Sequence, residues 1–456
     1  MTRNRLRSTP VPGHRDEYTG VDFNLGFHVR SYVLDLNYRV GPNRLTSVAT
    51  LQLDNWAPLS SLTLDLAAGM RVTQVTGSGT AGQNIVVSKF RQSGGKLRLK
   101  FREEIPVDSE FSLTIRYSGT PRPIRSAWGE IGWEELENGS LVASQPCGAP
   151  SWFPCDDTPD EKARYEITVT ADSPYSVIAN GTLISKKVSG SRTTWHYRVE
   201  HPMATYLATV QVGEYQQLEL GEAAGTAVRA WVPAQLKTQA SEEFVQQADM
   251  LALYSRLFGP YPFDDYTVVV VEDELEIPLE AQGLSVFGAN HIRGDHAWER
   301  LIAHELSHQW FGNSLGLAQW NDIWLNEGFA CYSEWLWFEH ADNIPAAESA
   351  REFYGELARK PQDLLLSDPG TRDMFDDRVY KRGALTVHAL RTMLGDEAFF
   401  RMLHRYISVG RHAVVELVDL KREVLQESRK LGIPDSEVDT LWTVWLDQRE
   451  LPAFPA

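Results

Sequence analysis

The sequence predicts an α+β protein in which a mostly antiparallel β domain is followed by a mostly helical domain. Hydrophobic and polar residues alternate through roughly the first two hundred positions, whereas helical periodicity prevails from about Ser241 onward. A chain of 456 residues, 43% of them hydrophobic, has room for two or three domains at about 150 residues each. We place the boundary near Gly213, which gives a β domain over residues 1–213 and a second domain over residues 214–456.

The β domain is predicted from segments in which every second residue is apolar. In YEITVTAD, Tyr165, Ile167 and Val169 share one face and polar residues occupy the other. The segments KLRLKF (96–101) and FSLTIRY (111–117) repeat this alternation, with Gly, Pro and Asp residues between the segments. Such half-buried strands joined by turns are typical of an antiparallel sheet with one face on a core.

The second domain is predicted from helical runs such as SEEFVQQADMLALYSRLFG (241–259). One strand-like segment, DYTVVVVED (265–273), interrupts these runs, and the chain then reads as largely helical to its end. No internal repeat, Gly/Ser linker or phosphate-cradling glycine loop is visible.

The charge and the cysteine content limit which macromolecular partners and which cellular compartment fit this chain. The chain has 44 Lys and Arg residues against 61 Asp and Glu residues, a net charge of −17 that disfavours nucleic acid and anionic membranes as partners. Three cysteines are too few for a disulfide framework, and no apolar run approaches the ~18 residues of a membrane span. The N-terminus is basic but lacks a leader-like apolar region. We expect a cytoplasmic protein, with a monomer favoured.

The segment GDHAWERLIAHELSHQWFGN predicts a helix with a metal-binding face. Asp295 is the expected N-cap and Gly312 the expected stop. His304 and His308 are spaced i, i+4, so both imidazoles can reach one ion, and Glu305 lies beside them where a water would stand. A pattern of this length also arises by chance, and two ligands do not complete a zinc site.

A third ligand is available in WNDIWLNEGFACYSE, where eighteen residues separate Glu327 from His308. Two histidines and one carboxylate form the open ligand set of a catalytic zinc, in which the fourth position is left to water. Glu334 follows seven residues later on the same helical face. It either orients a ligand histidine by a hydrogen bond or lies on a solvated surface, and its spacing does not separate these two alternatives.

The motifs HELSHQWFGN and WNDIWLNEGFA, together with WFPCDDTP (152–159) and VYKRGA (379–384), resemble the aminopeptidase N family of gluzincin zinc peptidases. That family also contains the leukotriene hydrolases. The resemblance spans essentially the whole chain and implies a saddle-like β domain followed by a thermolysin-like catalytic domain. It further implies one zinc ion held by His304, His308 and Glu327, with Glu305 as the general base.

The VYKRGA match implies that Tyr380 hydrogen-bonds the oxyanion that forms during peptide hydrolysis. A phenol with a pKa near ~10 stays protonated at neutral pH and can act as this donor. The residues alone would leave Tyr354 and Tyr406 as alternatives, because both also lie downstream of the metal motif.

In this family a glutamate within a Gly-Ala-Met-Glu-Asn stretch holds the free α-ammonium of the substrate. The aligned segment here is IPLEAQGL, which implies that Glu280 is that anchor, with Leu279 and Gly283 beside it in the substrate-binding site. The match at Gly283 and Leu284 supports this register. Leu279 and Ala281 replace the usual methionine and asparagine, so the preferred side chain of the substrate is not implied.

The resemblance also implies a second anchor from the β domain, in a Gln-x-Glu segment. This chain reads SQPCGAP, with Gln145 present but Cys147 in place of the carboxylate. Gln145 can accept a hydrogen bond from the ammonium. Cys147 and Cys155 lack the further ligands that a second metal site would need.

Relatives continue past the last motif of this sequence with a small β domain and a helical domain that covers the active site, so we expect a less enclosed site. The expected function is zinc-dependent removal of N-terminal residues from peptides. The alternatives are a thermolysin-like endopeptidase or an epoxide hydrolase on the same fold. A non-catalytic scaffold would be expected to have lost a ligand, the base or the oxyanion donor, and all are present.

Overall fold

The computed structural model describes residues 15–24, 26–79 and 85–455, so the basic N-terminal arginines lie outside the described residues. The chain forms two compact units. The first, called the β unit, comprises Met1–Leu218, Arg229–Lys237 and Asp264–His291. The second, called the helical unit, comprises Glu219–Val228, Thr238–Phe263 and Ile292–Ala456. This arrangement confirms the predicted α+β class, and the domain boundary at Gly213 stays a prediction.

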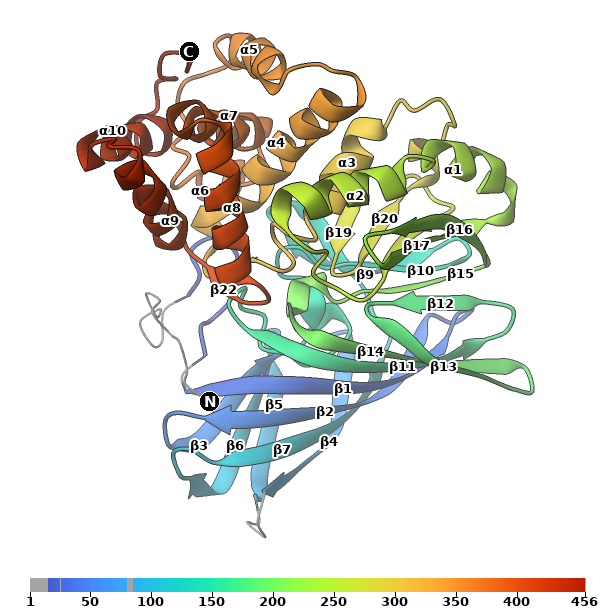
Figure 1. Cartoon of the computed structure of the whole chain (residues 1–456). Helices are drawn as coiled ribbons and strands as arrows, with labels where there is room; N and C mark the ends of the chain where they lie inside the picture. The colour runs from blue at the N-terminus through green and yellow to red at the C-terminus, as the bar shows by residue number, and fades with distance from the viewer. Residues whose placement is uncertain (1–14, 25, 80–84, 456) are drawn as a thin grey trace. The chain divides into compact units, whose positions relative to one another are not determined.

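The largest sheet of the β unit has seven strands (Figure 1). Neighbours within it pair antiparallel, except that β1 and β11 run parallel. In spatial order the strands are β13 (Thr182–Ser189), β14 (Arg192–Ala204), β11 (Lys162–Asp172), β1 (Phe27–Arg39), β2 (Arg44–Asn55), β7 (Glu110–Gly119) and β4 (Met70–Gly79).

Alternation along these strands produces the core that the sequence predicts. Tyr165, Ile167 and Val169 are buried on β11, whereas the residues between them are partly exposed. Strand β7 buries Leu113 and Ile115 in the same way. Burying side chains of this size stabilises the folded chain by roughly 1.5–3 kcal/mol each.

Three smaller sheets accompany the seven-stranded sheet. One has the order β3 (Leu59–Asp65), β6 (Lys96–Ile105), β5 (Val87–Ser93). A second has the order β12 (Ser176–Ala179), β15 (Val210–Gly213), β10 (Gly139–Ala143), β9 (Gly129–Leu136), β8 (Ile124–Ser126). The third has the order β16 (Tyr215–Ala223), β17 (Thr226–Pro233), β18 (Tyr266–Val270), β20 (Leu284–Phe287), β19 (Leu279–Ala281).

Strand β18 confirms the strand predicted from DYTVVVVED. The two strands that follow it, β19 and β20, are too short for periodicity to reveal, and the sequence analysis missed both. They form an antiparallel pair that turns at Gly283, where φ is +74°. Val269, Val271, Ala281 and Leu284 belong to one buried apolar cluster, which also contains Leu141 of β10.

The helical unit consists mainly of helices packed on one another (Figure 1). In chain order these are α1 (Lys237–Glu243), α2 (Gln247–Phe258), α3 (Glu299–Ser307), α4 (Trp324–Ala341), α5 (Ala346–Leu357), α6 (Gly370–Asp373), α7 (Asp377–Leu394), α8 (Asp396–Gly410), α9 (Leu417–Lys430) and α10 (Asp435–Leu446). A short parallel pair, β21 (Gly316–Leu317) with β22 (Val414–Val415), lies among them.

The helical run expected over residues 241–259 is two helices, because the chain turns at residues 244–246 between α1 and α2. Within the part of the chain that the structure describes, no helix has both the length and the apolar character needed to cross a membrane.

Candidate metal centre and active site

The HELSHQW segment lies on α3 and in the turn that follows it. The predicted N-cap at Asp295 is wrong, since α3 begins at Glu299. His296 has a left-handed backbone with φ of +59°, and the Asp295 carboxylate accepts the Ala297 N–H in a local turn. The start of the helix is instead supported by Glu243, whose carboxylate accepts the N–H of Trp298 at 3.4 Å.

Helix α3 also ends before the predicted stop at Gly312. Ser307 is its last residue, and His308 is the C-cap residue with αR backbone angles. The His308 N–H donates to the carbonyl oxygen of His304 at 3.3 Å, which keeps the two histidines one helical turn apart. The i, i+4 relationship therefore survives the early end of the helix.

The three predicted ligands converge in the helical unit. Nε2 of His304 and Nε2 of His308 each lie 3.4 Å from the same oxygen, Oε2 of Glu327 on α4. All three side chains are buried, and they form a group whose ligand atoms lie within 4.8 Å of one another. Tetrahedral zinc with bonds of about 2.0–2.2 Å requires ligand atoms about 3.3–3.6 Å apart. The donor set therefore fits zinc in both chemistry and spacing.

Electrostatics keep Glu327 in the ionised form that a metal ligand needs. Burial acts to raise the pKa of Glu327, but His308 and His304 outweigh it and lower the pKa to about 2. For His304, burial acts to lower the pKa, and the contacts with Glu327 and Glu334 raise it above its usual value. Protons and a metal ion therefore compete for the imidazole.

The structure decides between the two alternatives for Glu334. This side chain is only 1% exposed, which excludes a solvated surface position. Its Oε1 lies 2.7 Å from Nδ1 of His304, and both carboxylate oxygens accept from Nη1 of Arg300 at 3.1 Å. Burial acts to raise the pKa of Glu334, whereas the charge of Lys381 and the hydrogen bond with His304 lower it to about 2. An ionised carboxylate at Nδ1 fixes the tautomer in which Nε2 is free to bind a metal.

His308 is oriented by the backbone. Its Nδ1 lies 2.9 Å from the carbonyl oxygen of Phe311, in the turn after α3. Backbone carbonyls are a common partner for the second nitrogen of a ligand histidine. Sequence analysis missed this contact, and no side-chain signal could have revealed it, because a carbonyl is present at every position.

Of the three tyrosines considered from sequence, the structure brings Tyr380 to the ligands. Its ring stacks on the ring of His304, with centroids 6.0 Å apart and planes inclined by 20°. Tyr354 donates its hydroxyl to the carbonyl oxygen of Pro452, and Tyr406 is buried against Phe329. Glu305, the expected general base, is buried on α3 directly after His304.

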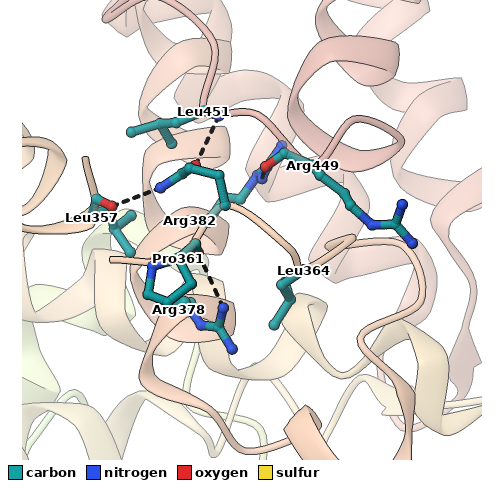
Figure 2. A pocket seen from close by; sticks show the side chains of 8 residues that line it. Leu357, Pro361, Leu364, Arg378, Arg382, Arg449 and Leu451 are labelled. Carbon is teal, nitrogen blue, oxygen red and sulfur yellow. Dashed lines mark hydrogen bonds between the residues drawn. The ribbon is translucent and has the colours of Figure 1, made fainter. Parts of the chain in front are cut away.

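Helix α7, which carries Tyr380, is anchored to the end of the chain by Arg382. This guanidinium, itself buried, donates to the carbonyl oxygens of five residues in the C-terminal segment: Val444, Trp445, Gln448, Arg449 and Glu450. Figure 2 shows Arg382 with Arg378, Arg449 and Leu451, which line the same small pocket. Arg382 was missed by sequence analysis.

The predicted substrate-binding residues all belong to the β unit. Glu280 is buried in β19, opposite Ser285 of β20, with Leu279 half-buried beside it. Gly283 supplies the turn between these strands, and Gln145 is half-buried after β10. The roles of these four residues in binding stay predictions.

Cys147, Cys155 and Cys331 are all free thiols. Burial raises the pKa of the Cys147 thiol to about 12, so it is a neutral group where relatives are expected to have a carboxylate. Among the described residues, the metal-ligating side chains that lie close enough together to share one ion are His304, His308 and Glu327.

Comparisons with known proteins decide the family. A model described as the M1 peptidase N-terminal domain matches residues 28–207, and one described as the peptidase family M1 domain matches residues 243–445. The chain belongs to peptidase family M1. This confirms the resemblance found in the sequence.

Among curated M1 relatives, aminopeptidase M1-D of Oryza sativa subsp. japonica is 26% identical over 450 residues, covering 93% of this chain and 50% of that protein. The chain thus spans about half the length of this relative. Two solved M1 structures align with this protein over nearly their whole length: each alignment covers 97% of this chain and 99% of the chain in the solved structure. One is a mutant of a two-domain M1 zinc metallopeptidase bound to L-arginine, with 28% identity and a TM-score of 0.84. The other is a mutant M1 zinc metallopeptidase from Deinococcus radiodurans bound to a Tyr-Ser-Ala substrate, with 29% identity and a TM-score of 0.85.

Proposed function

We propose that this M1 chain is a zinc aminopeptidase, a hydrolase that removes the N-terminal residue of peptides. The observation that carries the proposal is the buried group of His304, His308 and Glu327, whose spacing suits one zinc ion, with Glu305 next to it in the chain. Three protein ligands leave a coordination position open, which is typical of catalytic rather than structural zinc.

The relatives support both the reaction and the kind of substrate. The rice relative is named an aminopeptidase, and the two structures hold a free amino acid and a tripeptide substrate. A peptide with a free N-terminus would be the substrate here, and a free amino acid would be one product.

Zinc held by these three side chains supplies Lewis-acid catalysis and a water activated at neutral pH. Glu305 then serves as the general base that takes the proton of the attacking water and later passes it to the leaving amine. Tyr380 donates a hydrogen bond to the carbonyl oxygen as that oxygen gains negative charge. Glu334 holds His304 so that Nε2 faces the ligand group.

The exopeptidase preference is assigned to Glu280, which would pair with the α-ammonium of the substrate. A charged ammonium loses water when it enters a groove, and a carboxylate partner offsets that cost. Gln145 would accept a further hydrogen bond, while Leu279 and Gly283 would shape the wall around the first residue. A cytoplasmic location and a monomeric state are part of the same proposal, and the free cysteines support the former.

The test is a panel of fluorogenic aminoacyl amides, assayed with and without a chelator, and again after zinc is restored. We expect hydrolysis that the chelator abolishes and zinc recovers. N-acetylated and longer blocked peptides form the second arm. Equal cleavage of blocked and free peptides would replace the proposal with a thermolysin-like endopeptidase, and turnover of a lipid epoxide alone would replace it with an epoxide hydrolase.

A further inference from the structure

Lys381 is a buried cation beside the candidate metal centre that the reaction scheme above does not use. It follows Tyr380 on α7 and is 7% exposed. Its Nζ lies 3.4 Å from Sγ of Cys331 and 4.3 Å from the centre of the Phe353 ring. The same nitrogen lies 4.0 Å from Oε2 of Glu334. The ammonium therefore faces one full negative charge, a thiol and an aromatic ring.

Two cationic side chains, Arg300 and Lys381, thus lie next to the carboxylate of Glu334. Arg300 forms hydrogen bonds to both carboxylate oxygens, but 45% of its side chain is exposed, whereas the side chain of Lys381 is 9% exposed. The attraction between two charges at a given distance is about fourfold stronger at the effective dielectric of a protein than in water. Water and salt also screen the exposed arginine more strongly. Lys381 therefore adds a less screened positive charge to the hydrogen bonds that Arg300 supplies to Glu334.

The effect of this charge reaches the metal ligands through one imidazole ring. Glu334 engages Nδ1 of His304, and the opposite nitrogen, Nε2, lies 3.4 Å from Glu327 in the ligand group. A shift of the Glu334 carboxylate would therefore rotate His304 or release it. At 4.0 Å the lysine is beyond hydrogen-bond range of Glu334, so it acts on the carboxylate by charge.

We propose that Lys381 is a positioning residue for the metal centre: its buried ammonium holds Glu334 against Nδ1 of His304 and so keeps Nε2 directed at the zinc. This inference rests on the zinc site of the proposed function. It predicts that Lys381 affects zinc affinity without touching the metal: Lys381 acts on Glu334, and Glu334 orients the ligand His304. The simpler alternative is that Lys381 only packs on Phe353.

The test compares zinc affinity among purified full-length variants, measured by competition with a chromogenic chelator. Lys381→Met should weaken zinc binding by about 10–100-fold, the range seen when outer partners of ligand histidines are removed. Lys381→Arg keeps the charge and should bind zinc about as tightly as the wild type. The cobalt(II)-substituted Lys381→Met protein should show an altered visible spectrum, because the ligand geometry changes.

Two further variants separate charge from packing. Lys421, whose Nζ lies 5.7 Å from the Trp442 ring on the same unit, provides the matched control, and Lys421→Met should leave zinc affinity unchanged. Phe353→Leu removes the ring under Lys381 but keeps the ammonium, and it should also bind zinc normally.

Wild-type affinity and an unchanged cobalt spectrum in Lys381→Met would overturn the proposal. An equal loss in Phe353→Leu would overturn it too, in favour of packing. If Lys381→Met does not fold, Lys381→Gln provides a smaller neutral replacement, judged by the same two readouts after its circular dichroism matches the wild type. Because neither readout needs a substrate, a wild type that binds zinc but cleaves no peptide would contradict the proposed function alone.

Discussion

Gly328 of α4 lies directly against Gly383 of α7. A Cβ added to either glycine would stand 2.7 Å from the Cα atom of the other, closer than backbone atoms can approach. Helix α4 carries Glu327 and α7 carries Tyr380. The two glycines thus set the distance between the helix that supplies a metal ligand and the helix that supplies the expected oxyanion donor.

Gly328→Ala should therefore destabilise the protein by about 1–3 kcal/mol, the usual cost of overpacking, and should lower kcat as the two helices separate. Urea unfolding and steady-state kinetics would measure the two effects. Gly355→Ala on α5 is the matched control, since nothing lies within 4 Å of its added Cβ, and it should be neutral or stabilising. Equal behaviour of the two variants would show that the helix contact is not tight.

Glu305→Gln should lower kcat by at least about 100-fold, because the amide cannot accept the proton of the attacking water. Zinc content and unfolding midpoint should match the wild type, since Glu305 is not among the ligands of the buried group. Elemental analysis and hydrolysis of an aminoacyl amide check both statements. Near-normal turnover in a zinc-loaded variant would remove Glu305 from the role of base.

Tyr380→Phe should cost about 100–1000-fold in kcat with little change in KM, because the lost hydrogen bond forms only as the carbonyl oxygen becomes charged. Tyr354→Phe removes a hydroxyl that binds the Pro452 carbonyl and should leave kcat close to the wild type. Steady-state kinetics on one substrate suffices for the comparison. A loss confined to KM would reassign Tyr380 to substrate binding.

Glu280→Ala should lower kcat/KM for peptides with free N-termini by about 30–1000-fold, or roughly 2–4 kcal/mol, if this carboxylate pairs with the ammonium. Glu276→Ala, in the exposed loop before β19, is the control and should have little effect. The N-acetylated form of the same peptide should be a poor substrate for the wild type. A Glu280→Ala enzyme as active as the control would leave the ammonium without its proposed anchor.

Asp322 lies just before α4, and its ionisation should lower the free energy of unfolding as the pH rises. Burial raises its pKa to about 6, although its carboxylate accepts the Leu417 N–H. Between an unfolded pKa near ~3.9 and this folded value, the folded state binds more protons than the unfolded state, so ionisation favours unfolding. Asp322→Asn should remove this slope and stabilise the protein by roughly 1–3 kcal/mol at pH 7.

Urea unfolding at several pH values from 4 to 7 measures the effect, with exposed Asp439→Asn as the control. A slope between pH 4 and pH 6 that persists in Asp322→Asn would assign it to another group. A less stable variant at pH 7 would show that the hydrogen bond to Leu417 needs the charge.

Local sequence was sufficient to predict those features that depend on spacing along one element. The alternating residues of β11 and β7 face the core, because side chains of a strand alternate between its two faces. His304 and His308 converge because four residues make about one helical turn. Glu327 was offered as a third ligand by its type and position on the next predicted helix, and the motif match added Tyr380; the structure brings both to His304.

The predicted start of α3 was wrong because the carboxylate that supports the actual start comes from a distant part of the chain. Glu243, near the end of α1, accepts N–H groups of Gly294 and Trp298, and no local rule connects it to them. The parallel pairing of β1 with β11 is likewise long-range.

The sequence by itself determined the family, the ligand types and the faces of the long strands, since these follow from residue chemistry and fixed periodicities. Only the tertiary structure decided that Glu334 is buried against His304, that Lys381 lies behind it, and that Gly328 meets Gly383. Each of these depends on two helices packing at one particular distance. Burial removes water from such groups, so their charges and contacts act strongly only once the helices have met.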